Sequence, residues 1–473
     1  MSDPTDYTFQ SAASGRHQLY RSSLTAIGLL LAYCIYNGWS LPFEQLALAL
    51  VVVILAAWPA IAWLRSQPYQ FPAFEAFMLT CIPSYALPLI SNHSSVLMFS
   101  DTVIFKSLAA IVLFQVTALF AFKQTLARER STLFWNEVLF TRDISHWLPA
   151  GLWLNTAYIA VSRFTEWIPW EIDSILRAVF FGIATSCSFL LGREWGSGGL
   201  SQRRRLNVLF ALLISSLLLM ASLYLINAIA AVLVFFLAYL SAGRRIPWVA
   251  LGLVFVVLSV LHNGKTEMRE KYWAEGAPRV ALTDLPEFFS EWIELGIAPM
   301  RDDEDAPKRR ELLDRASLLQ IICLVVETTD NGLPFLAGET YGYVLPQFVP
   351  RIFWSDKPTG QITTRRLGIH FGLQDESSAK TTSIGFGVFA EAFANFGYWG
   401  VGLLGLLIGT LNKVISMWTR NSPMLSNGGL IMILLMAWSI QVELPMSGWV
   451  SSLYQAAFCV LGVPFIIKRF FNA

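Results

Sequence analysis

Charged residues are scarce in this sequence. Asp, Glu, Lys and Arg make up 14% of its 473 residues, whereas soluble globular chains carry about 25%. This shortage excludes an ordinary water-soluble domain and indicates that lipid solvates much of the apolar surface. The formal net charge of +1 gives no basis for a nucleic-acid partner.

Cysteine and histidine are also few. The five cysteines form no CxxC or other metal-ligand spacing, and most lie inside apolar runs, so they are predicted to be packing residues. The long polar loop described below has no cluster of Asp and His ligands. Neither a metal nor another cofactor is therefore expected.

Apolar residues are abundant instead, at 55% of the chain. They collect in runs of about 17 to 21 residues, the length that a helix needs to cross a bilayer. The runs are Ser22–Gly38, Glu44–Leu64, Phe71–Ile90, Asp101–Phe122, Ser145–Ser162, Asp173–Gly192, Leu206–Ala242 counted as two, Pro247–His262, Phe396–Met417, Gly428–Val442 and Trp449–Ile467. They predict an all-α polytopic membrane protein with about twelve transmembrane helices.

Basic residues are concentrated on one side of the predicted membrane. If the N-terminus is cytoplasmic, the short loops on the opposite side contain only Arg163. The cytoplasmic segments contain Arg16, Arg21, Arg65, Lys123, Arg128, Arg130, Arg142, Arg193, Arg203, Arg204, Arg205, Arg244, Arg245, Lys413, Arg420, Lys468 and Arg469. Because short cytoplasmic loops are enriched in Lys and Arg, both termini are expected in the cytoplasm.

One large hydrophilic loop, residues 264–383, is then placed outside the cytoplasm. It separates an N-terminal transmembrane bundle (1–263, about nine spans) from a C-terminal bundle (384–473, about three spans). The loop domain is expected to contain amphipathic and partly re-entrant helices. One of these is the apolar run Leu312–Val326, which Asp314 and Arg315 interrupt, so we interpret it as packed or partly re-entrant and not as a span.

Another helix is predicted to start at Asp284-Leu285-Pro286, an N-cap followed by proline in the first turn. Apolar residues then recur on one face, and Glu287, Glu291 and Glu294 lie on the other. This helix either lies in the outer membrane interface or caps the loop's own small core. The charged stretch Arg301–Glu311 that follows it reads as a solvated hinge.

The most distinctive stretch of the loop is Gly332–Lys357, completed by Pro358. Its prolines and glycines predict turns and extended pieces. Irregular backbone at membrane level needs protein or a water-filled cavity around it. The mouth of a cavity is therefore the expected position of this segment.

The stretch GETYGYVLPQFVPRIFWSDKP resembles a recurrent segment of Wzy-type oligosaccharide repeat-unit polymerases, which make O-antigen and exopolysaccharide. Arg315-Ala316-Ser317 before it and EAFANFGYWG (Glu391–Gly400) after it follow the usual order of that family. The Arg-x10-Gly pattern of some O-antigen polymerases is absent at Arg315, Arg351, Arg365 and Arg366. Residue roles from that branch are therefore not transferred.

The resemblance implies a membrane-embedded glycosyltransferase, multi-pass in the bacterial cytoplasmic membrane. It would transfer a growing glycan from polyprenyl pyrophosphate to the hydroxyl of the next lipid-linked repeat unit, at the outer membrane face. The implied partners are this lipid-linked oligosaccharide, the bilayer, and flippase and chain-length regulator proteins.

Such a reaction needs cations for the pyrophosphate leaving group. The loop offers Arg315, Arg351, Lys357, Arg365 and Arg366 as candidates for substrate binding. Adjacent prolines rank Arg351 and Lys357 highest. The structural alternative is that these cations pair with acidic neighbours such as Asp356, Asp375 or Glu376, or reach toward lipid headgroups.

The candidate catalytic bases are Glu391, Glu339 and His370. Glu391 stands in an apolar, glycine-rich entry to a span, where a carboxylate is costly and points to a function. The alternative for Glu391 is a hydrogen bond to Asn395 or Tyr398 that holds a re-entrant turn. Tyr341, which we include among the substrate-binding candidates, could stack on a sugar ring or anchor the loop in the interface.

Two other functions remain open. An O-antigen ligase would use the same lipid donor with a different acceptor, and the loop does not separate the two. A polysaccharide transporter or flippase would place polar residues at the bilayer midplane and often show two similar halves. We find no internal repeat, and the reactive residue types gather in one external region.

Overall fold

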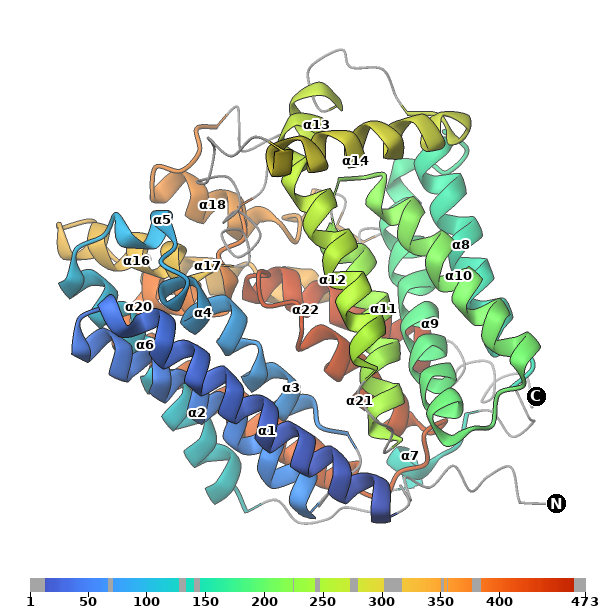
Figure 1. The fold of residues 1–473 in the computed structure, drawn as a ribbon, viewed down its shortest axis with the longest axis horizontal. Coiled ribbons are helices and arrows are strands. Elements are labelled where there is room, and N and C mark those ends of the chain that lie inside the picture. Colours follow the sequence, from blue (N-terminus) through green and yellow to red (C-terminus); the bar gives the residue numbers. More distant parts are fainter. Residues whose placement is uncertain are drawn as a thin grey trace. The chain divides into compact units, whose positions relative to one another are not determined.

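The computed structural model describes residues 13–66, 71–126, 133–139, 145–223, 225–242, 247–272, 280–301, 317–349, 353–354, 356–376 and 384–462. Over these ranges the chain is helical and has no β-strand (Figure 1). The predicted all-α class is therefore confirmed.

Five described helical segments are long and apolar enough to cross a membrane: Leu19–Ser40, Phe43–Ser66, Ala73–Ile90, Asp101–Gln124 and Gly387–Trp418. Three shorter apolar helices are Val232–Ser241, Trp248–Asn263 and Asn427–Trp438. These segments support a membrane protein. The count of about twelve spans stays a prediction, as do the large external loop and the cytoplasmic termini.

The chain forms two compact units. The first comprises Met1–Pro4, Thr8–Leu19 and Phe140–Leu312, and the second comprises Thr5–Tyr7, Tyr20–Leu139 and Leu313–Ala473. The segment predicted as one loop domain, residues 264–383, thus contributes to both units.

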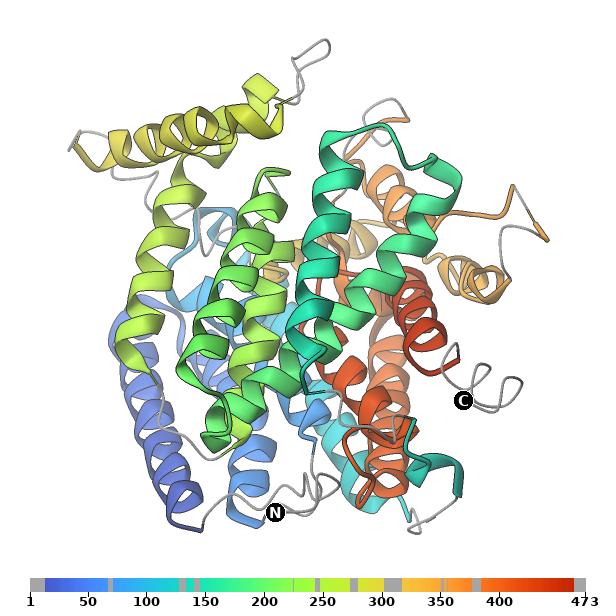
Figure 2. The ribbon, with the colours of Figure 1, turned by 90° about the vertical axis from the view of Figure 1, so that its right-hand side faces the viewer.

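The first unit is a helical bundle. Its helices are α8 (Leu148–Phe164), α9 (Trp170–Ser197), α10 (Gln202–Met220), α11 (Leu225–Ser241), α12 (Trp248–Asn263), α13 (Lys265–Tyr272), η3 (Leu282–Asp284) and α14 (Leu285–Arg301). Figures 1 and 2 show α14 lying across the end of α12. Phe288 and Trp292 of α14 are buried in a cluster with Leu261 of α12. The apolar face of α14 is therefore buried in a core that loop residues share with α12 and the segment after α10. This core is not the loop's own, and the placement of α14 in the outer membrane interface stays a prediction.

The second unit contains the two sequence motifs that carry the family resemblance, the stretch that begins at Gly338 and Glu391–Gly400. Its elements are α1 (Ala13–Asn37, in this unit from Tyr20), η1 (Gly38–Ser40), α2 (Phe43–Ser66), α3 (Ala73–Leu79), η2 (Ile82–Ala86), α4 (Leu87–Ile90), α5 (Ser94–Leu97), α6 (Asp101–Gln124), α7 (Leu133–Asn136), α16 (Leu319–Asp330), α17 (Glu339–Gly342), η5 (Leu345–Phe348), α18 (Ile362–His370), α20 (Gly387–Trp418), α21 (Asn427–Trp438), α22 (Met446–Ala457) and η6 (Phe458–Gly462).

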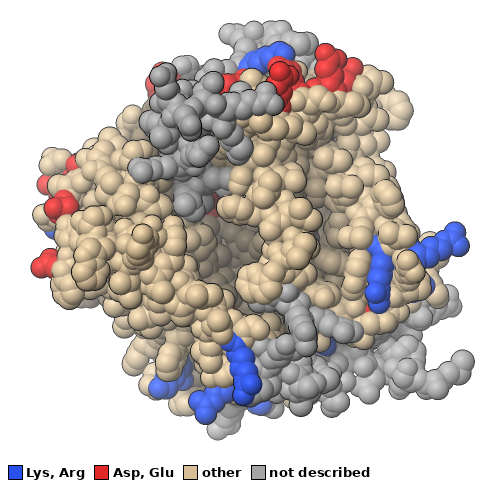
Figure 3. Space-filling view, viewed as in Figure 1, with Lys and Arg blue, Asp and Glu red and all other residues tan. Residues whose placement is uncertain are grey.

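Helices α2 and α6 of this unit run in the same direction. The Gln45 amide at the start of α2 donates to the Asp101 carboxylate at the start of α6 (2.8 Å). Basic residues stand where the two helices finish, with Arg65 in the last turn of α2 and Lys123 in that of α6. On the face drawn in Figure 3, Lys and Arg gather toward one end of this unit, and Asp and Glu toward the other. We call these the basic end and the opposite end.

Helix α16 covers part of the predicted helix Leu312–Val326. The described helix starts at Leu319, directly after Leu318, whose backbone N–H donates to the Ser84 carbonyl in the middle of the interrupted α3–α4 helix. The last residue of α16, Asp330, lies at the end of the unit opposite the basic end, where it pairs with Lys106 of α6 at 2.7 Å. The apolar residues of α16 are buried in the core of the unit, so the helix is packed, as predicted.

Helix α20 reverses direction at Gly397, where φ is 59° and ψ is −142°. On the first arm, residues 387–396, the Phe389 ring lies 4.1 Å from that of Phe114 in α6. On the second arm, residues 398–418, a Cβ placed on Gly405 would lie 2.6 Å from the Phe114 carbonyl oxygen. A continuous helix would separate residues 389 and 405 by about 24 Å along its axis. The two arms therefore fold back beside the same part of α6.

The second arm of α20 packs closely on α6 because its glycines lack side chains. A Cβ on Gly405 would lie 2.1 Å from the Thr117 hydroxyl oxygen, and one on Gly409 would lie 2.2 Å from the Ala118 carbonyl oxygen. At Gly402 the nearest atom would be 3.8 Å away, an ordinary contact. Close helix packing on glycine thus applies to Gly405 and Gly409.

We predict that Gly405→Ala and Gly409→Ala each destabilise the protein by about 1 to 3 kcal/mol, because the backbone of α6 must move to admit the methyl group. Gly402→Ala is the matched control, since its methyl group has room. Thermal unfolding in detergent compares the three variants. Equal Tm values for Gly405→Ala and Gly402→Ala would contradict this packing.

Candidate functional site

The two sequence motifs Gly338–Gly342 and Glu391–Gly397 are in contact. The N–H groups of Leu336 and Ala337 donate to the carbonyls of Ala394 and Asn395, at 3.0 and 3.2 Å. These carbonyls lie at the end of the first arm of α20, where the reversal removes their helical partners. The incoming backbone therefore caps the first arm.

Gly338 allows this close approach. Its φ is +93°, and a Cβ there would lie 3.0 Å from the Phe396 ring. Its N–H also donates to the Asn395 side-chain oxygen at 2.9 Å. Glycine is thus favoured at this position both by backbone conformation and by space.

Glu391 is fully buried on the first arm. Its Oε1 accepts from the Thr340 hydroxyl at 2.8 Å, and its Oε2 accepts from the backbone N–H of Met446 at 2.6 Å. Asn395 donates to the Glu391 carbonyl oxygen, also at 2.8 Å. The side chain thus ties α17 to the start of α22. The partners of the carboxylate are therefore Thr340 and Met446, not Asn395 or Tyr398, which the structural alternative named.

Glu339 and Arg366 form an ion pair between α17 and α18. Arg366 Nε and Nη2 donate to the two carboxylate oxygens of Glu339 at 2.7 and 3.0 Å, and the Tyr343 hydroxyl donates to Oε1 at 3.1 Å. The side chains of Arg366 and Glu339 are 37% and 38% exposed. The two charged groups of this bidentate pair are partly exposed, so a ligand can reach them.

The ion pair shifts both pKa values. The hydrogen bonds from Arg366 lower the pKa of Glu339, with smaller effects of Tyr343 and the charge of His370. The same hydrogen bonds raise the pKa of Arg366. At neutral pH the pair is therefore fully charged.

His370 and Tyr341 lie near this pair with contacts of their own. His370 Nε2 lies 3.1 Å from the Pro334 carbonyl oxygen, to which it donates. The Tyr341 ring stacks on Phe396, with centroids 6.3 Å apart, and burial raises the pKa of its hydroxyl. His370 therefore stays with the candidate site, while Tyr341 packs against the reversal of α20.

Lys357 was among the best candidates for phosphate binding, but its side chain is buried. Its ammonium group donates to the carbonyls of Val349 and Gln347, at 2.7 and 3.3 Å. Gln347 in turn donates to the carbonyls of Tyr343 and Pro358. Lys357 thus closes the Pro-rich segment on itself, which is a structural role.

Three further cations were predicted to bind phosphate: Arg315, Arg351 and Arg365. Arg365 is exposed on α18. Arg315 and Arg351 lie outside the described residues. Thr340 and Met446 are contacts that the sequence reasoning missed. Thr340 lies inside the recognised motif, which is a signal that could have found it, whereas no sequence signal points to the backbone N–H of Met446.

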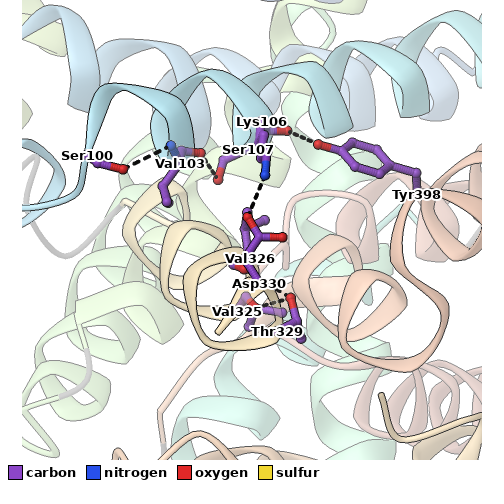
Figure 4. A network of polar contacts seen from close by, with 9 residues as sticks. All are labelled: Ser100, Val103, Lys106, Ser107, Val325, Val326, Thr329, Asp330 and Tyr398. Carbon is purple, nitrogen blue, oxygen red and sulfur yellow. Dashed lines mark hydrogen bonds and ion pairs between the residues drawn. The ribbon is translucent and has the colours of Figure 1, made fainter. Parts of the chain in front are cut away.

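A second polar cluster lies beside the reversal of α20 (Figure 4). Lys106 of α6 pairs with Asp330 of α16, and the Tyr398 hydroxyl donates to the Lys106 carbonyl oxygen at 3.1 Å. Figure 4 shows these side chains converging from three helices. Since Tyr398 follows Gly397 directly, this contact places the reversal, and with it the candidate site, at the opposite end from the basic residues.

Within the described ranges, no three His, Cys, Asp or Glu side chains gather where they could hold a metal ion. Comparisons of the chain with family models, with curated proteins and with solved structures gave no match.

We predict that Arg366→Ala raises the pKa of Glu339 toward that of an ordinary carboxyl group. Because the folded-state pKa of Glu339 is lowered, the ion pair stabilises the protein above the unfolded-state pKa, and this is lost as the pH falls through the folded-state value. Infrared difference titration against Glu339→Gln isolates this carboxyl group. Arg65→Ala, which removes an exposed cation at the basic end, is the control. An unchanged titration in Arg366→Ala would show that the pair does not form.

Proposed function

We propose that this protein polymerises polyprenyl-pyrophosphate-linked oligosaccharide repeat units into a surface polysaccharide at the outer face of the bacterial cytoplasmic membrane. One observation carries the proposal. The two motifs that resemble Wzy-type polymerases lie about fifty positions apart in the sequence, and they meet through specific hydrogen bonds next to an accessible arginine–carboxylate pair.

Charge distribution supports the side of the membrane. The site lies at the end of its unit opposite Arg65 and Lys123, the residues that the positive-inside rule assigns to the cytoplasm. The substrate that suits this side is a lipid-linked glycan and not a cytoplasmic nucleotide sugar.

In the proposed reaction, the bond between the anomeric carbon of the donor glycan and its pyrophosphate oxygen breaks. A bond from the same carbon to the acceptor hydroxyl oxygen forms. The hydroxyl proton moves to a base, and the pyrophosphate leaves with the electron pair of the broken bond. The developing negative charge on the leaving group needs a cation most in the transition state.

Arg366 is the described cation best suited to this task, because its planar guanidinium group binds phosphate oxygens through two N–H groups. In the structure it holds Glu339 in that way. A pyrophosphate that takes over Arg366 would release the Glu339 carboxylate. The released carboxylate has a higher pKa than the paired one and can accept the proton of the acceptor hydroxyl. Glu391 has no such role in this proposal because both of its oxygens are occupied in the core.

Deletion of the gene in its host tests this proposal. Loss of a polymerase should leave surface glycan with single repeat units. Loss of a ligase should leave polymer that is not transferred, and loss of a flippase should trap lipid-linked units inside the cell. Unchanged long chains in the deletion strain would rule out the proposed polymerase.

The deletion strain then serves for complementation with variants. We expect Arg366→Ala to lower polymerisation about 10- to 100-fold, the loss that corresponds to a charge-assisted bidentate contact. Arg65→Ala should restore long chains, since this cation lies at the basic end. Near-normal chain length with Arg366→Ala would remove Arg366 from the site while leaving the deletion result intact.

A further inference from the structure

Glu391 is a buried acidic residue that the proposed reaction does not use. Its two carboxylate oxygens accept from different elements, one from the Thr340 hydroxyl in α17 and the other from the N–H of Met446, the first residue of α22. A carboxylate at a helix N-terminus is electrostatically favoured. Burying such a group is costly unless its hydrogen bonds are satisfied, and here both oxygens have a donor.

Thr340 links Glu391 to Asn395 on the next turn of the first arm. The Asn395 amide nitrogen donates to the Thr340 hydroxyl oxygen at 2.8 Å, and the Asn395 side-chain oxygen accepts from the Gly338 N–H. The turn Gly338–Gly342 is thus held at two points, Gly338 and Thr340. Glu339, which binds Arg366, lies between them.

We propose that Glu391 is a positioning residue for the Glu339–Arg366 pair, and that it acts by fixing the turn Gly338–Gly342 through Thr340 and Asn395. The inference rests on the proposed function only where it takes this pair as the substrate-binding group. The geometric part, that Glu391 holds the turn in place, stands independently of any activity.

The hydrogen-bond directions explain why a carboxyl group is needed. Glu391 accepts hydrogen bonds at both of its oxygens. The Thr340 hydroxyl has a single proton and donates it to Glu391. In Glu391→Gln, the NH2 group of the amide would face another donor, either the Met446 N–H or the Thr340 hydroxyl. The amide has the same shape as the carboxylate, so a loss of order in the turn would report this mismatch and not a cavity.

A spin label on the turn tests the inference. Gly342→Cys places the label where a Cβ meets no atom within 4 Å. Leu403→Cys, 61% exposed on the second arm of α20, carries the reference label. A Cys459→Ser background removes the one cysteine that is not buried among the native five.

We expect the label at residue 342 to become more mobile in Glu391→Gln and in Thr340→Val, which removes the hydroxyl group at nearly constant shape. Thr340→Ser keeps the hydroxyl group and should give the same spectrum as the parent protein. The label at residue 403 should not change in any variant. In the complementation strain, Thr340→Val should lower polymerisation at least about tenfold, and Thr340→Ser should retain it.

Unchanged mobility of the label at residue 342 in both Glu391→Gln and Thr340→Val would overturn the inference. Equal loosening at residues 342 and 403 would also overturn it, because Glu391 would then serve the fold as a whole. If Glu391→Gln fails to insert, Thr340→Val decides the question with the carboxylate in place. If the label responds as expected but the deletion strain keeps its long glycan chains, the proposed function falls and the positioning of the turn stands.

Discussion

The reversal of α20 at Gly397 is the constraint on which the described site depends. A helix that stops inside an apolar bundle leaves backbone carbonyls without donors, and such groups are costly where water is absent. Here the N–H groups of Leu336 and Ala337 supply the donors for two of these carbonyls, and the N–H of Gly338 donates to the Asn395 side-chain oxygen. The segment after α16 and the first arm of α20 therefore hold each other in place. The segment contributes N–H donors, and the first arm contributes the carbonyl acceptors.

Side chains add further hydrogen bonds between the first arm of α20 and the turn Gly338–Gly342. Asn395 and Glu391 point from the first arm to the turn and satisfy its polar groups. Glu339 is left on the exposed side of that turn, where Arg366 of α18 meets it. Buried polar groups thus set the geometry, and the exposed pair next to them is the part that a ligand can reach.

The sequence predicts the helices well, because long apolar runs and the amphipathic pattern of α14 depend on local composition. It also predicts that Glu391 either reacts or holds a re-entrant turn. It does not predict the partners of Glu391 and Arg366, because Met446 and Glu339 lie far from them in the sequence. Lys357 shows the same limit: its charge suggests phosphate, but its buried position gives it backbone carbonyls instead.

The distance between the two arms of α20 tests the fold-back most directly. Spin labels at Ile384, which lies three residues before α20, and at Leu406 measure this distance. A continuous α20 would separate its first residue, Gly387, from Leu406 by about 29 Å along its axis. The account predicts a clearly shorter distance, because Phe389 and Gly405 both lie against Phe114. A measured distance near the continuous-helix value would contradict the reversal and, with it, the contact between the two motifs.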